Sequence, residues 1–100
     1  MKLKQNDDWQ KLVGQRLEQA RIVLGKKHVE MARVADASPQ AWNNYTKGAR
    51  PLALEGAILL CNRYGLTLDW IYRGRTEGLP HSLADKLMQE TSTVVPIKRR

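Results

Sequence analysis

Apolar residues in segment 9–24 recur every three or four positions, which is the spacing of one face of an α-helix. This pattern predicts a first helix over residues 9–24. A carboxylate accepts hydrogen bonds from the free N–H groups of a first helical turn, so we expect Asp7 or Asp8 to cap its start. Gly25 would end it, because glycine readily adopts the left-handed conformation. The preceding residues 1–8 are predicted as an N-terminal arm.

Two short helices are predicted next, over residues 28–35 and 39–47. Ser38 is a strong N-cap candidate for the second helix, and Pro39 occupies its first position, where a missing N–H costs nothing. Gly48 would end the second helix. The residues available for burial in the first of the two are Val29, Ala32 and either Met31 or Val34.

Three further helices are predicted over residues 54–64, 67–72 and 82–90, because glycine, proline or polar caps bound each helical pattern. No alternating pattern is long enough to predict a strand. We therefore expect an all-α fold of one domain, with residues 91–100 as a loose tail. The buried stripe of the helix over residues 54–64 is predicted to contain Leu54, Ala57, Ile58 and Cys61.

The charge of the chain narrows the class of partner. Seventeen Lys and Arg against ten Asp and Glu leave a net charge of +7 on 100 residues, and such a surplus favours polyanions. The surplus is uneven, since residues 1–50 hold ten basic and five acidic residues, against seven and five in residues 51–100. We expect the polyanion-binding face in the first half.

The sequence lacks the residues that several classes of function require. No stretch approaches the ~18 consecutive apolar residues of a membrane span, and the N-terminus carries no apolar leader segment. Cys61 is the only cysteine, so no intrachain disulfide forms and we expect a reducing cytoplasm. His81 and Asp85 lack a third metal ligand. Because no nucleophile–base pattern or phosphate loop occurs, we expect no enzyme, metal, cofactor or small-molecule substrate.

Residues 28–47 have the pattern of two short helices joined by a tight turn, which places the second helix in the DNA major groove. Further signals are Met31-Ala32, Ala37-Ser38, Trp42, Tyr45, Gly48-Ala49-Arg50-Pro51 and Tyr64-Gly65-Leu66-Thr67-Leu68-Asp69-Trp70-Ile71. With these residues the chain resembles the lambda-repressor-like, or xenobiotic-response-element (XRE), helix-turn-helix family over residues 9–73. The resemblance implies a five-helix lambda-repressor-like DNA-binding domain there, followed by a C-terminal extension, residues 74–100, with a short helix and a basic tail.

The resemblance also implies a function, that of a bacterial transcriptional regulator, most often a repressor, which binds specific double-stranded DNA. Because one recognition helix reads few base pairs, we expect a homodimer, with contacts between copies from the helix over residues 67–72 and the C-terminal extension.

Two positions of this sequence depart from the family pattern. His28 replaces a Gln that binds phosphate, and a phosphate contact from His28 is still chemically reasonable. Thr46 replaces a Glu that pairs with Arg21, which leaves the partner of Arg21 open.

The base-contacting residues are expected on the first turns of the helix over residues 39–47. An amide offers a donor and an acceptor that can pair bidentately with adenine, and an apolar side chain can contact a thymine methyl. Asn43 and Asn44 are poor helix formers placed back to back, which favours a functional role. Trp42 and Tyr45, on the opposite side, are predicted core anchors. The expected base-contacting residues are Pro39, Gln40, Asn43 and Asn44.

Phosphate contacts are expected on both sides of this helix. Cationic side chains and free backbone N–H groups after residue 47 can hold phosphates. The expected phosphate-contacting residues are His28, Ser38, Lys47 and Arg50. For Lys26, Lys27 and Arg33, a solvated surface is an equally good interpretation.

Two other interpretations stay open. An antitoxin-like or other protein-interaction module on the same fold would be favoured by acidic residues on the helix over residues 39–47, which has none. An RNA or membrane-surface binder would use only the net charge. The apolar helix faces are needed for a core, which argues against the membrane surface.

Overall fold

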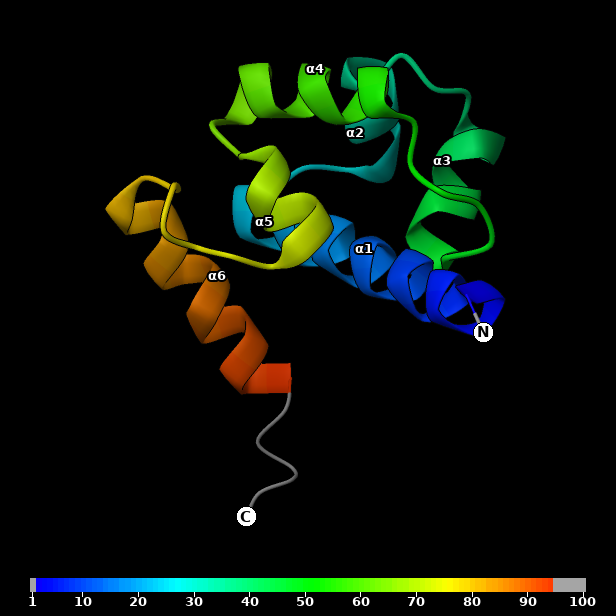
Figure 1. Cartoon of the computed structure of the whole chain (residues 1–100). Helices are drawn as coiled ribbons and strands as arrows, with labels where there is room; N and C mark the ends of the chain where they lie inside the picture. The colour runs from blue at the N-terminus through cyan, green and yellow to red at the C-terminus, as the bar shows by residue number, and fades with distance from the viewer. Residues whose placement is uncertain (1, 95–100) are drawn as a thin grey trace.

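The computed structural model describes the backbone of residues 2–94 and the side chains of residues 8–89. Residues 2–94 form helices joined by turns and contain no strand, so the predicted all-α fold is confirmed (Figure 1). The helices are α1 (Lys2–Leu24), α2 (His28–Val34), α3 (Pro39–Lys47), α4 (Leu54–Tyr64), α5 (Leu68–Arg73) and α6 (His81–Val94).

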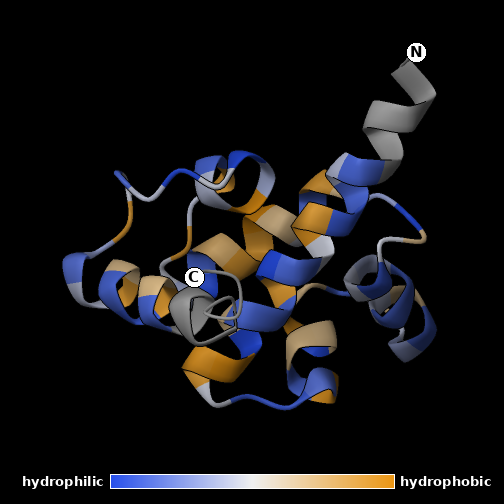
Figure 2. Cartoon of the chain, turned by 90° about the horizontal axis from the view of Figure 1, so that it is seen from below, coloured by the Kyte–Doolittle hydropathy of each residue, from blue (hydrophilic) through white to orange (hydrophobic). Residues whose placement is uncertain are grey.

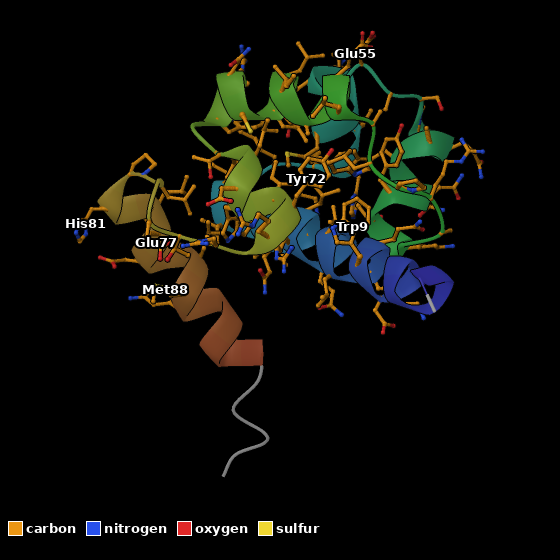
Figure 3. All side chains as sticks on the ribbon, viewed as in Figure 1. Trp9, Glu55, Tyr72, Glu77, His81 and Met88 are labelled. Atoms are coloured by element: carbon orange, nitrogen blue, oxygen red, sulfur yellow. The ribbon has the colours of Figure 1, made fainter. Side chains whose placement is uncertain are left out.

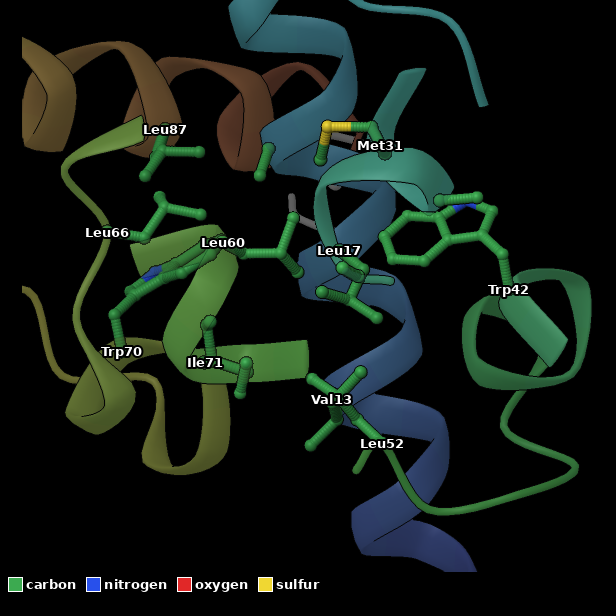
Figure 4. Packing of buried hydrophobic residues seen from close by; sticks show 14 of the residues in the cluster. Val13, Leu17, Met31, Trp42, Leu52, Leu60, Leu66, Trp70, Ile71 and Leu87 are labelled. Atoms are coloured by element: carbon green, nitrogen blue, oxygen red, sulfur yellow. The ribbon is translucent and has the colours of Figure 1, made fainter. Parts of the chain in front are cut away.

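Helix α1 is the centre of the molecule, since α3, α5 and α6 all pack against it (Figure 1). Helix α4 covers α2 and contacts α5. In Figure 2 the hydrophobic positions gather where the helices meet. The buried side chains form one core, to which every helix contributes (Figure 4). Its largest fully buried members are Trp42, Leu17, Met31, Leu60, Ile71, Leu87 and Val13.

The start of α1 differs from the prediction. The helix begins at Lys2 rather than at residue 9, so the segment predicted as an arm is helical from Lys2 onward. Asp7 and Asp8 lie inside the helix and do not cap it. The physical reason is that residues 2–8 contain no Pro or Gly and include Lys, Leu and Gln, which favour helix.

An aromatic contact holds the early part of α1 against the rest of the fold. The ring of Trp9 stacks on that of Tyr72 in α5, with ring centroids 5.6 Å apart and an angle of 8° between the planes (Figure 3). The hydroxyl of Tyr72 donates a hydrogen bond to the carbonyl of Leu52, at 3.1 Å. Together the ring stacking and this hydrogen bond join α1, α5 and the segment between α3 and α4.

The orientation of α4 corrects the predicted buried stripe. Ala57 is buried as predicted and Cys61 is half-buried against the core, but Leu54 and Ile58 are 59% and 40% exposed, and Gly56 and Leu60 are buried in their place. A Cβ atom on Gly56 would lie only 3.1 Å from the carbonyl oxygen of Ala35. The small residues therefore turn inward because α4 lies close to the end of α2, and the larger aliphatic side chains turn to solvent.

The other helix ends lie close to the predicted ones. Helix α3 has the predicted bounds, and α5 is shifted by one residue because Thr67 acts as its N-cap rather than its first residue. Helix α6 continues to Val94, so residues 91–94 are helical rather than part of a tail. The predicted basic tail, Lys98-Arg99-Arg100, lies outside the described residues.

Candidate nucleic-acid interface

The N-terminus of α3 is built as predicted. The Ser38 hydroxyl oxygen accepts a hydrogen bond from the backbone N–H of Ala41, at 3.0 Å, and Pro39 follows as the first helical residue. At the other end Gly48 has φ +77°, the left-handed conformation that ends a helix. Both ends of the helix are thus fixed by local sequence.

Helix α3 divides its side chains between core and solvent. Trp42 is 2% exposed and reaches into the core, where Figure 4 shows its ring directed toward Met31. Tyr45 packs against the same core. Both predicted anchors are confirmed. On the outer side Pro39, Gln40 and Asn43 are exposed, whereas Asn44 is half-buried. Three of the four expected base-contacting residues are therefore open to solvent, and Asn44 is only partly so.

The crossing of α1 and α3 sets the position of this face. A Cβ atom on Gly14 would lie 2.7 Å from the carbonyl oxygen of Tyr45 and closer still to that of Thr46. Only glycine allows the last turn of α3 to approach α1 so closely. Gly14 therefore offsets its poor helix propensity by bringing the two helices together.

His28 links the start of α2 to α3. The indole N–H of Trp42 donates a hydrogen bond to Nδ1 of His28, at 3.2 Å. Because Nδ1 accepts this bond, the ring proton of the neutral imidazole resides on Nε2. Nε2 lies 3.7 Å from a carboxylate oxygen of Glu18, and the side chain is 55% exposed. His28 therefore holds α3 in place, and its exposed ring keeps Nε2 beside the Glu18 carboxylate.

Arg21 has a partner on its own helix. Its Nε donates to Glu18 at 3.3 Å, and its Nη1 donates to the carbonyl of Lys26 at 3.1 Å. The hydrogen bond from Arg21 is the main cause that lowers the pKa of Glu18. Thr46 makes no contact of this kind, since its hydroxyl donates to the carbonyl of Asn43 at 3.1 Å. The sequence left this partner open, although Glu18 lies three residues before Arg21 on the same helix.

A small open groove lies between the starts of α2 and α3. Its volume is about 300 Å³, and its walls are mainly apolar. Val29 was predicted to be available for burial but is 49% exposed here. The groove is lined by His28, Val29, Pro39, Trp42 and Asn43. An apolar surface thus lies directly beside an exposed amide.

A basic cluster, Lys11, Lys47 and Arg50, lies at the C-terminal end of α3. All three side chains are exposed. The turn at Gly48 packs on α1, because a Cβ atom there would lie 2.7 Å from Cα of Lys11. The sequence prediction missed Lys11, since only this packing brings it beside the turn.

The backbone N–H groups after α3 were expected to be free to hold phosphates, and the structure corrects this expectation. Those of Ala49 and Arg50 donate to the carbonyl of Asn44, at 2.9 and 3.3 Å, and that of Gly48 donates to Tyr45. These donors are therefore used inside the chain and are not free for a phosphate. At the start of α2 the N–H of Lys27 is likewise taken by the carboxylate of Glu30, at 2.8 Å. This N–H is therefore also not free for a phosphate.

Other sites receive no support from the described residues. His81 and Asp85 are both exposed, and residues 8–89 hold no group of three His, Cys, Asp or Glu side chains able to bind a metal. Over residues 2–94, no helix has the length and apolar character that crossing a bilayer requires. Comparison with protein-family profiles, with characterised proteins and with solved structures finds no match to this chain.

Proposed function

We propose that the chain is a sequence-specific double-stranded DNA-binding transcriptional regulator, a cytoplasmic repressor of the lambda-repressor-like helix-turn-helix kind. In this proposal α1–α5 form the DNA-binding domain and α3 is its recognition helix. The observation that carries the proposal is the division of α3 into a buried aromatic side and an exposed amide side, with no acidic residue along the helix.

The exposed side of α3 has the chemistry of base recognition. Gln40 and Asn43 can each pair bidentately with the N6 and N7 atoms of adenine. Asn44 is half-buried, so it adds a contact at the edge of this face. The groove beside Asn43 can receive the methyl group of a thymine through Val29 and Pro39. Adenine–thymine pairs are therefore the expected bases in the recognition site.

The residues around α3 have the chemistry of phosphate binding. The basic cluster of Lys11, Lys47 and Arg50 lies at one end of the helix. His28 and Ser38 lie at the other end, and each keeps a hydrogen on a side-chain atom, because Nδ1 and Oγ act as acceptors inside the chain. The Nε2 atom of His28 would have to turn this hydrogen from the Glu18 carboxylate, 3.7 Å away, to a phosphate. Phosphate contacts on both sides of a recognition helix fix its register on the duplex.

Selection of duplexes from a random pool tests this function. We expect enrichment of two inverted half-sites whose centres lie about one helical turn apart, roughly 34–36 Å, because a two-fold dimer repeats its contacts. Recovery of unenriched DNA would contradict the proposal. In that case a protein-interaction module of the antitoxin-like kind becomes the better interpretation, since no base readout is then left for α3.

A further inference from the structure

Helix α4 carries an unpartnered aliphatic surface. Leu54, Ile58 and Leu59 are 59%, 40% and 40% exposed, although leucine and isoleucine normally bury their side chains. Ile58 and Leu59 line an open groove of about 330 Å³ together with Asp36 and Glu55. These side chains lie on the face of α4 opposite the core, and Figure 3 shows Glu55 pointing away from the molecule. Within residues 8–89 these three side chains are thus only partly covered.

The charges at the two ends of this surface are opposite. Glu55 and Asp36 lie at the N-terminal half of α4, and Arg63 lies in its last turn. Neither Glu55 nor Arg63 has an ion-pair partner among residues 8–89. An acidic end and a basic end on one helix face complement a second, antiparallel copy of the same face.

We propose that two copies of this chain associate through an antiparallel pairing of their α4 helices. The two-fold axis passes between Ile58 and Leu59, because pairing about this midpoint brings four aliphatic side chains together. It also places Glu55 of each copy level with Asn62 of the partner copy and one residue away from the partner copy's Arg63. A two-fold interface uses the same patch on both copies. This patch meets that condition, because its charges are self-complementary and its centre is apolar.

The proposed function calls for two copies of the chain, and the α4 surface would join them. This interface is argued from α4 alone and does not require DNA. It differs from the expectation that α5 and the C-terminal extension join the copies. Trp70 and Ile71 of α5 and Leu87 of α6 are buried within the chain. Those apolar side chains are therefore already used by the fold.

Sedimentation equilibrium of the full chain without DNA tests the interface, over a range of micromolar concentrations. We expect the wild type to dimerise. The Leu59→Asp variant should be monomeric, because the change places two carboxylates at the two-fold axis in an apolar contact. Met88→Asp is the matched control, since Met88 is an exposed apolar residue on α6 and is 54% exposed (Figure 3). Unchanged circular dichroism shows that each variant folds.

A charge exchange tests the antiparallel register. Glu55→Arg and Arg63→Glu should each weaken dimerisation several-fold, because each brings like charges together. The double variant should recover the wild-type dimerisation constant. A monomeric wild type, a dimeric Leu59→Asp variant, dissociation by Met88→Asp or failure of the double variant to recover would each overturn the interface. Sequence-specific DNA binding is measured separately, so either proposal can fail alone.

Discussion

Truncating a base contact and truncating a phosphate contact have different consequences. If Gln40 and Asn43 pair with base edges, changing either to Ala should cost about 1–3 kcal/mol of binding free energy on the selected site and little on random DNA. Arg50→Ala should weaken binding to both duplexes by similar factors, because every base pair carries the same phosphates. Fluorescence anisotropy titrations with both duplexes measure these effects.

Gln15→Ala is the control for this comparison, since Gln15 is an exposed amide on α1. It should leave both affinities unchanged. Equal losses on selected and random DNA for Gln40→Ala and Asn43→Ala would show that these amides do not read bases.

The hydrogen bond between His28 and Trp42 gives a second prediction about single residues. His28→Leu removes the acceptor and leaves the indole N–H of a buried Trp42 without its partner, which should cost about 1–3 kcal/mol of unfolding free energy. His28→Gln should cost less, because an amide oxygen can accept the same bond. Urea unfolding measures both variants.

A double-mutant cycle isolates this bond. In a Trp42→Phe background, where the donor is absent, His28→Leu should lose most of its effect. An equal cost in both backgrounds would mean that His28 stabilises the fold through some contact other than its bond to Trp42.

At the scale of helices, the crossing of α1 and α3 depends on Gly14. Gly14→Ala should destabilise the fold by about 1–3 kcal/mol, because the added methyl group meets two backbone carbonyls that cannot move without shifting α3. This is the net cost that remains after the ~1 kcal/mol that Ala normally gains over Gly within a helix. Thermal and urea unfolding measure the change.

Gly78→Ala is a suitable comparison, because its Cβ would lie 3.5 Å from a Thr67 methyl carbon, an ordinary contact. It should change stability little. A Gly14→Ala variant that is more stable than the wild type would contradict the close crossing.

Helix ends were predicted well where local chemistry determines them. Ser38, Pro39 and Gly48 act within one turn of the chain, so the bounds of α3 follow from the sequence. The start of α1 was missed because a capping residue can also lie inside a longer helix. The rotation of α4 was missed because it depends on the contact between Gly56 and Ala35, which lie far apart in the sequence.

In the candidate site, too, features set by the local sequence were predicted and features set by tertiary packing were missed. The exposed amides and the buried Trp42 of α3 follow from helical spacing. The pairing of Glu18 with Arg21 was left open, although the two residues are only three apart, because side-chain spacing does not reveal which of several charges will pair. Lys11 was missed because it reaches the end of α3 only through tertiary packing.

For the whole molecule, the net charge predicts a strong effect of salt on DNA binding. Each neutralised phosphate releases counterions, so the logarithm of the association constant should fall linearly with that of salt concentration, by about 0.9 per phosphate contact. Lys11→Ala and Arg50→Ala should each reduce this slope by about 1. Lys86→Ala, an exposed cation on α6, should leave the slope unchanged. A flat plot for the wild type would exclude a phosphate-binding face.

The most direct test of the account is the ratio of affinities for the selected site and for a shuffled duplex of the same composition, measured at physiological salt. Base readout by α3 predicts a ratio of about 10³ or more, which is typical of specific regulators. The Asn43→Ala and Gln40→Ala double variant should lose most of this ratio while it still binds both duplexes. A wild-type ratio near one would contradict the account, since the positive charge alone would then explain all binding.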